Sequence, residues 1–176
     1  MIIQTERLII NKAAASTKDI DMYFRLWNHP QVMVNVGFPD GLGISKEEIH
    51  TLLNEWDDKK YIRCIVKRKH DQILIGECKL GEPDENGVCE TDVKLFPEYW
   101  GNGYGKEIKR GLVDYLFAHK SKCLAVKADP KKSNIASIKM QEYVGGVIIE
   151  RGKVYPIKNI EEYFPPEGHW LYMVFK

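Results

Sequence analysis

Apolar residues recur every three or four positions in two stretches of the first half of the chain, residues 16–28 and 45–57. This period predicts two amphipathic helices. Ser16 or Thr17 is placed to cap the first, and Ser45 with Glu48 forms a capping box at the second. The second helix is expected to reach about residue 57 with Trp56 facing inward, and residues 30–44 to form a loop, because glycine and proline recur there.

Short apolar runs bounded by polar turns predict the strands. The first covers residues 5–13, and a hairpin joins 61–66 to 73–80. Further strands are expected at 88–96, 123–126, 147–150 and 170–175, with helices at 106–119 and 133–144 and a proline-broken excursion at 154–168. The order β α α β β β α β α β β predicts a single α+β domain over residues 1–176, whose sheet is mixed where helices cross over.

Composition narrows the function classes. The 176 residues carry a formal net charge of +1, so no strong global field recruits nucleic acid. No apolar run approaches the roughly 18 residues that span a bilayer, and the first residues lack the layout of a signal peptide, so a cytoplasmic protein without membrane contact is expected. The spacing of the four cysteines fits no CxxC pair and no zinc pattern, which favours reduced core cysteines and no metal site.

The segment Tyr99-Trp-Gly-Asn-Gly-Tyr-Gly-Lys-Glu107 lies between a predicted strand and a predicted helix. Glycines let a ligand approach the backbone, and the free N–H groups of a first helical turn favour an anion, so a phosphorylated cofactor is expected. A P-loop would need Ser or Thr where Glu107 stands, and a dinucleotide fingerprint would need Gly where Lys106 stands. A glycine turn that serves packing alone also stays open at this point.

The loop resembles the acyl-CoA pyrophosphate signature of the GNAT superfamily of N-acyltransferases, Gln/Arg-x-x-Gly-x-Gly/Ala. Gly103 and Gly105 match its small positions, whereas Trp100 departs from Gln/Arg. The chain is most similar to the subgroup that resembles ribosomal-protein N-terminal (alanine) acetyltransferases, which shares Tyr-Trp-Gly-x-Gly-Tyr-Gly/Ala, an Asn-x-x-Ser matched by Asn134 and Ser137, and an opening like Thr5-Glu-Arg-Leu8.

This resemblance implies a GNAT-like fold, mostly antiparallel, that binds acetyl-CoA. The diphosphate would lie on backbone N–H groups of residues 101–106, and the preceding strand would splay from its neighbour near Leu95-Phe96 to pair with pantetheine. The implied cofactor-binding residues are Leu95, Phe96, Trp100, Gly101, Asn102, Gly103, Tyr104, Gly105, Lys106, Asn134 and Ser137.

The catalytic candidates follow from what acyl transfer to an amine needs. Glu90 and Asp92 lie two apart on one side of a strand, and Glu90 aligns with a Glu common in the subgroup, so Glu90 is the first candidate to take the amine proton and Asp92 the second. The acid is less defined, because Gln141 stands where many relatives have Tyr, and Tyr143 should face elsewhere on the helix. Ser137 is the candidate near the sulfur.

The expected activity is acetyl transfer from acetyl-CoA to a primary amine in a ternary complex. The acceptor is a protein N-terminus or a small amine such as a polyamine or aminoglycoside; the nearby acids 84, 85, 90 and 92 favour a cation. The aromatic-rich segment 155–172 is a candidate to close the acceptor pocket or to form a homodimer contact. A non-catalytic acyl-CoA-binding module is the alternative, because the tyrosine is missing at 141.

Overall fold

The computed structural model describes residues 2–55 and 60–176. The expected inward position of Trp56 and the expected helix end near residue 57 lie outside these residues. None of the described helices is long and apolar enough to cross a membrane.

The strands of the described chain form one mixed sheet in the order β1-β2-β3-β4-β5-β6-β8-β7. Neighbouring strands are antiparallel except β5 and β6, which are parallel because α4 crosses over between them. The bounds are β1 Ile3–Gln4, β2 Leu8–Lys12, β3 Tyr61–Arg68, β4 Leu74–Gly81, β5 Val88–Leu95, β6 Ala125–Ala128, β7 Val147–Ile148 and β8 Tyr172–Phe175. The predicted α+β class is confirmed.

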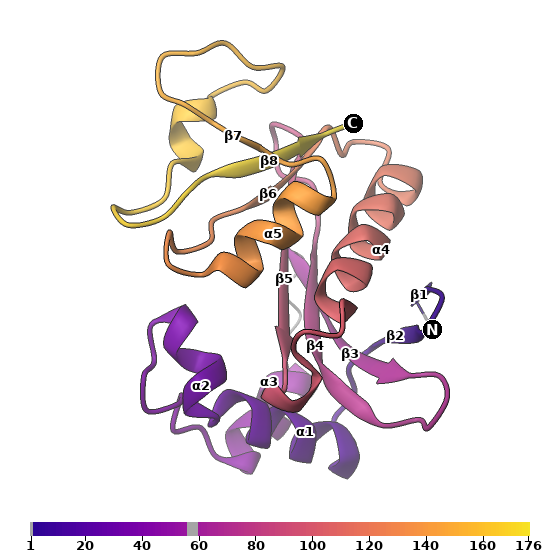
Figure 1. The fold of residues 1–176 in the computed structure, drawn as a ribbon. Coiled ribbons are helices and arrows are strands. Elements are labelled where there is room, and N and C mark those ends of the chain that lie inside the picture. Colours follow the sequence, from indigo (N-terminus) through magenta and orange to yellow (C-terminus); the bar gives the residue numbers. More distant parts are fainter. Residues whose placement is uncertain (1, 56–59) are drawn as a thin grey trace.

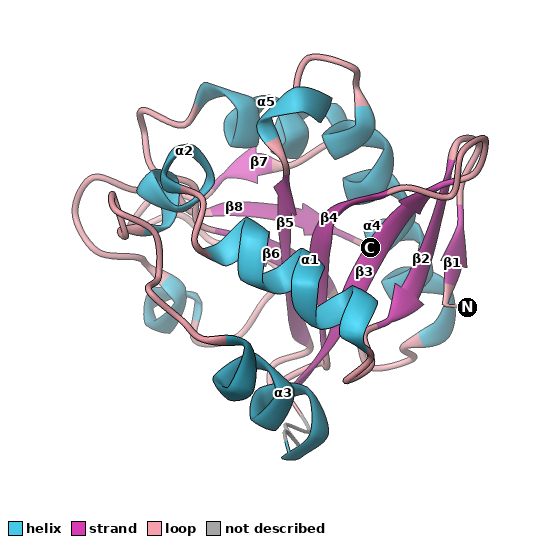
Figure 2. Ribbon diagram, turned by 90° about the horizontal axis from the view of Figure 1, so that it is seen from below, coloured by secondary structure: helices cyan, strands magenta, loops and turns pink. Residues whose placement is uncertain are grey.

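Helices cover both faces of this sheet. In Figure 2, α1 (Thr17–Trp27) crosses the near face of β3 to β5, with α3 (Lys46–Glu55) beside it, and α4 (Tyr104–His119) lies behind the sheet. Figure 1 shows α5 (Ile135–Tyr143) next to α4, on the side of β8. The side chain of Ser16 caps α1, and the Ser45–Glu48 capping box forms as predicted.

Two local predictions were incomplete. The expected loop at 30–44 contains a short helix, α2 (Pro30–Met33), followed by the 3-10 turn η1 (Val34–Val36). Pro30 occupies the first helical position, where its missing N–H costs nothing, and burial of Val32 and Met33 holds the turn. The first strand, expected at 5–13, covers only residues 8–12 as β2, and the strand β1, which was not predicted, precedes it and pairs with it antiparallel.

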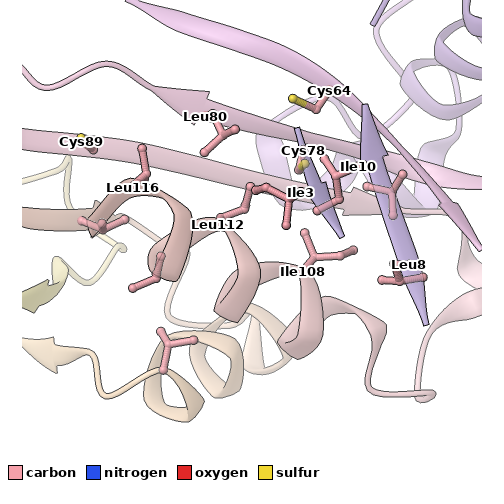
Figure 3. Packing of buried hydrophobic residues seen from close by; sticks show 14 of the residues in the cluster. Ile3, Leu8, Ile10, Cys64, Cys78, Leu80, Cys89, Ile108, Leu112 and Leu116 are labelled. Atoms are coloured by element: carbon pink, nitrogen blue, oxygen red, sulfur yellow. The ribbon is translucent and has the colours of Figure 1, made fainter. Parts of the chain in front are cut away.

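The core between the sheet and α4 holds the molecule together. Ile108, Leu112 and Leu116, one face of α4, are fully buried against the sheet (Figure 3), and each contributes about 1.5–3 kcal/mol. All four cysteines are free and buried, with Cys64 and Cys78 directly opposite on β3 and β4. Their predicted place in the core is therefore confirmed, and their reduced state stays a prediction.

The two arms of the sheet separate between β5 and β6. Their pairing runs from Val88 opposite Ala125 to Glu90 opposite Lys127 and ends there, although β5 continues to Leu95 alongside β4. In Figure 1 the lower part of β5 stands apart from the strands β6, β8 and β7. The predicted splay is present, and it opens closer to the start of β5 than the expected Leu95-Phe96.

Candidate functional site

A cleft of about 690 Å³ occupies the place where β5 and β6 part. One wall is the outer edge of β5, and the other is formed by residues 128–131 after β6 and by α5. The glycine loop and the first turns of α4 line one end, while Val32, Asn35 and Val36 line it from the α2–η1 side. The cleft is therefore bordered by segments from both faces of the sheet.

The glycine loop presents free backbone donors to this cleft. Gly101 and Gly103 adopt left-handed φ values of 75° and 78°, which favour glycine. Within the described chain, the N–H groups of residues 101–106 donate to no protein acceptor, and α4 begins at Tyr104 without a side-chain cap. A Cβ at Gly101 would meet no atom within 4 Å. This cradle fits a diphosphate, which accepts several hydrogen bonds and is favoured at a helix N-terminus.

A brace from the N-terminal segment holds the loop. Glu107 accepts hydrogen bonds from the Thr5 hydroxyl at 2.6 Å, the Arg7 backbone N–H at 2.8 Å and the Arg7 Nε at 2.7 Å. The Arg7 guanidinium also donates to the Asn102 carbonyl at 3.1 Å and lies over the Tyr104 ring. Burial alone would raise the pKa of Glu107, but the hydrogen bonds from Thr5 and Arg7 outweigh burial. The pKa of Glu107 therefore lies below its usual value, and the carboxylate stays charged.

The free edge of β5 supplies main-chain groups. The Phe96 N–H donates to Ile75 of β4, so Asp92, Lys94 and Phe96 direct their main chain toward β4, and the odd-numbered residues face away. The Val93 N–H consequently points to the cleft side, where the Asp92 carboxylate accepts it at 2.9 Å. The Leu95 carbonyl accepts the Trp100 indole N–H at 2.8 Å.

On the α1 face of β5, the acidic residues are paired with lysines. Glu90 accepts from Lys79 Nζ at 2.6 Å and lies 3.0 Å from Lys127 Nζ. Burial raises the pKa of Glu90, but the two ammonium groups outweigh it, so its pKa lies below the usual value. Asp92 pairs with Lys94, which in the same way holds the pKa of Asp92 low against burial.

A buried lysine from α4 lies against the opposite face of β5. Lys109, in the second turn of α4, is 1% exposed and donates to the Thr91 hydroxyl at 2.6 Å. Among the described residues it forms no ion pair within 4 Å, and burial lowers the pKa of Lys109 to about 8, although Asp92 and Glu90 act in the opposite direction. Both Lys109 and Thr91 line the cleft.

The start of α5 forms the far wall. The Asn134 side chain caps the helix by accepting the Ser137 N–H at 3.1 Å, and both residues line the cleft. Gln141 is 4% exposed and also lines it, whereas Tyr143 is 52% exposed and lies near Arg110 and Lys106. Tyr143 faces away from the cleft, as the helical geometry predicted.

Most of the predicted site residues meet in this cleft. They are Glu90, Asp92, Leu95, Trp100, Gly101, Gly103, Tyr104, Gly105, Lys106, Asn134 and Ser137. Two do not line it. Phe96 is buried in the α1 core with its N–H already used by Ile75, and Asn102 points its amide at the Trp100 carbonyl.

The aromatic-rich segment does not border this cleft, since no residue of 150–170 lines it. Tyr163 instead bonds Asp84 at 2.6 Å and accepts from Asn86 at 3.0 Å, and Tyr155 stacks on Phe175. The expectation that this segment closes the pocket is wrong for the cleft described here, because its side chains hold the excursion onto the sheet.

Sequence reasoning missed the braces and the buried lysine. Arg7 and Glu107 are separated by 100 positions, so no local pattern links them. Lys109 stands between Ile108 and Arg110 on a helix. Its spacing of three and seven positions from the buried Leu112 and Leu116 is the one sequence signal that it faces inward.

Comparisons with known proteins agree with this geometry. The acetyltransferase (GNAT) domain family matches residues 7–147. An uncharacterised N-acetyltransferase of Bacillus licheniformis, p20, is 27% identical over 144 residues, 78% of each chain. A GNAT-family acetyltransferase from Bacillus anthracis has a TM-score of 0.74 at 22% identity, covering 99% of this chain and 98% of its own.

The same fold occurs in a spermidine N-acetyltransferase from Vibrio cholerae, solved with CoA and spermine. Its TM-score is 0.75 at 19% identity, over 96% of this chain and 95% of that one. The family match spans most of the chain and includes the whole glycine loop and β5. The chain therefore belongs to the GNAT acetyltransferase family and is an acetyl-CoA-dependent acyltransferase.

Proposed function

We propose that this protein transfers an acetyl group from acetyl-CoA directly to a primary amine while both are bound. The observation that carries the proposal is one continuous cleft lined by the glycine loop and α5 on one side and by Val32, Asn35 and Val36 on the other. Two substrates can reach the parting of β5 and β6 from opposite faces, so no covalent relay is needed.

The chain's own groups divide the binding work. The N–H groups of residues 101–106 hold the diphosphate, and Lys106 adds positive charge at the same end of the cleft. The Val93 N–H is the donor for the thioester carbonyl, because it points to the cleft side of β5. The Asp92 carboxylate that now accepts this N–H must turn away when the thioester binds.

Glu90 is better suited to organising the acceptor side than to taking a proton. Its carboxylate neutralises Lys79 and Lys127, and its lowered pKa makes it a weak base at neutral pH. The amine therefore loses its proton to water, and Glu90 fixes the positions of Lys79 and Lys127 beside it. Asp92, with Lys94 beside it, is no stronger a base.

The acceptor follows from the same pairing. Glu90 and Asp92, where the strands part, are already neutralised by lysines. A second positive charge on the acceptor amine would therefore add little binding energy there. We therefore place a protein N-terminal amine first, in keeping with the motifs shared with ribosomal-protein N-terminal acetyltransferases, and polyamines such as spermidine second. A homodimer remains a proposal as well; Val147 and Ile148 on the edge strand β7 are exposed.

An acceptor panel tests the activity. Thiol release from acetyl-CoA would be followed with peptides that begin with alanine or serine, with spermidine, and with an aminoglycoside. We expect release with at least one primary amine and a product acetylated on nitrogen by mass spectrometry. CoA binding without release on the whole panel would contradict acetyl transfer to these amines.

A variant pair tests the diphosphate cradle. Gly103→Val places a side chain in the loop, and calorimetry should find CoA affinity reduced by roughly 100-fold or more, as expected when a phosphate loses several charge-assisted hydrogen bonds. Gly152→Val is the matched control, because Gly152 has the same left-handed φ, 77° against 78°, and lies outside the cleft. Equal CoA affinity in the two variants would overturn the assignment.

A further inference from the structure

The floor of the cleft contains a proton donor that the acetyltransferase motifs do not identify. Thr91 is the first residue of β5 beyond the last β5–β6 pair, so it marks the point where the strands part. Lys109 Nζ is held there by its 2.6 Å hydrogen bond to the Thr91 hydroxyl. The ammonium therefore lies at the deep end of the space that opens between the strands.

Other cleft side chains that carry a proton are less suited, by position or by chemistry, to donate it where the strands part. Tyr99 and Tyr104 belong to the glycine-loop end, and Tyr104 precedes Lys109 by more than a helical turn. Gln141 and Ser137 have no proton that ionises near neutral pH. Lys94 is engaged by Glu77 and Asp92.

The charged surroundings of Lys109 come from several elements. β5 contributes Asp92 and Glu90 on its opposite face, and β4 contributes the Cys78 thiol to the same core as α4. On α4 itself, Lys106 lies one turn earlier and lines the cleft. Burial outweighs the two carboxylates and holds the pKa of Lys109 at about 8, close to that of a thiol, about 8.5.

We propose that Lys109 is the general acid of the reaction, the group that protonates the leaving sulfur. This inference rests on the proposed function. The carbon–sulfur bond breaks as the carbon–nitrogen bond forms, Lys109 Nζ gives its proton to the sulfur, and the amine releases one proton to water. Lys109 regains a proton from water, so the chain ends unchanged. Thr91 is a positioning residue that fixes Nζ at the parting of the strands.

The first test needs CoA alone. A protonated Lys109 beside the bound sulfur stabilises the thiolate, so the thiol pKa of bound CoA, read from ultraviolet absorbance of the thiolate, should be about 1 to 3 pH units lower in the wild type than in Lys109→Met. Methionine has nearly the shape of lysine and suits a buried site. Lys109→Gln serves as a second substitution, and melting temperatures check that both variants fold.

The control is Lys106→Met, a lysine on the same helix that also lines the cleft. It should weaken CoA binding and leave the thiol pKa of bound CoA unchanged. The same thiol pKa in the wild type and both Lys109 variants, with CoA bound in each, would overturn the proposal. Because this measurement uses no acceptor, it is independent of whether any amine in the panel is acetylated.

Kinetics give the second test once an acceptor is known. Lys109→Met should lower kcat by about 100-fold, the low end for general acid catalysis, because a thiolate leaves readily. KM for acetyl-CoA should change less than about threefold, and the decline of kcat above about pH 8 in the wild type should disappear. An unchanged alkaline limb in Lys109→Met would contradict the assignment.

Discussion

The two faces of β5 border the same cleft, but the charged side chains on them have different partners. On the α1 face, Glu90 and Asp92 each lie against lysines, so charges compensate one another. On the α4 face, Lys109 is buried with a hydroxyl as its hydrogen-bond partner. Burial without a counter-charge lowers the pKa of Lys109, whereas compensation keeps the carboxylates ionised. The carboxylates on the α1 face therefore keep a fixed charge near neutral pH, whereas Lys109 on the α4 face can gain or lose its proton.

The largest expected effect tests compensation on the α1 face. Buried Glu77 accepts the Trp27 indole N–H at 2.6 Å and lies 3.3 Å from Lys94 Nζ. Glu77→Gln leaves part of that positive charge uncompensated, so the free energy of unfolding should fall by about 3 kcal/mol in urea titrations. Glu82→Gln, which breaks a half-exposed pair with Lys120, should cost below about 1 kcal/mol. Equal losses would show that burial of the pair is irrelevant.

The second prediction has the opposite sign. The lowered pKa of Lys109 means that burying its charge costs the folded state about 3 kcal/mol of stability at neutral pH. Replacing Lys109 removes this cost, but it also leaves the Thr91 hydroxyl without its hydrogen-bond donor, which costs about 1–2 kcal/mol. Lys109→Met should therefore raise the free energy of unfolding by about 1–2 kcal/mol at pH 7. Thr91→Val, which removes the partner and keeps the charge, should lower it.

The stability difference between Lys109→Met and the wild type should depend on pH. Below about pH 8, Lys109 is charged in the folded and unfolded chain, and the full cost of burying it is present. Between about pH 8 and 10 the folded state is neutral while the unfolded state still binds the proton, so the wild type gains stability as pH rises. The advantage of Lys109→Met should fade over this window; a constant advantage would contradict the assigned pKa.

The third prediction concerns Glu90 as a base. Because Lys127 and Lys79 keep its pKa low, Glu90→Gln should reduce kcat by less than about tenfold, and the acidic limb of the pH–rate profile should not move. Steady-state kinetics across pH measure both. A loss of about 100-fold together with a vanished acidic limb would make Glu90 the base and remove the contrast between the faces.

The smallest effect concerns the acceptor. If the α1 face is compensated, spermidine and an alkylamine of equal length should differ in kcat/KM by no more than about threefold, because an exposed ion pair is worth less than about 1 kcal/mol. Initial rates with the two amines at equal ionic strength measure this. A preference for spermidine above tenfold would show that uncompensated negative charge borders the site.

Local sequence patterns predicted the elements well where the energetics are local. The Ser45–Glu48 box, the Ser16 cap and the apolar face of 106–119 each lie within one helix, and all form as expected. The α2 turn was missed because burial of Val32 and Met33, rather than propensity, holds it. The prediction for Phe96 did not hold because register with β4 decides which N–H groups stay free.

The sequence by itself determined the glycine loop, the order of strands and helices, and through them the family and its cofactor. These depend on spacing within a few residues, where backbone conformation and helix ends leave direct traces. Only the tertiary structure decided which charges meet. Glu90 pairs with Lys79 and Lys127, Arg7 braces a loop near residue 102, and Lys109 is buried against Thr91. Such pKa-setting contacts join residues far apart along the chain, and they follow from how helices and strands pack rather than from any local pattern.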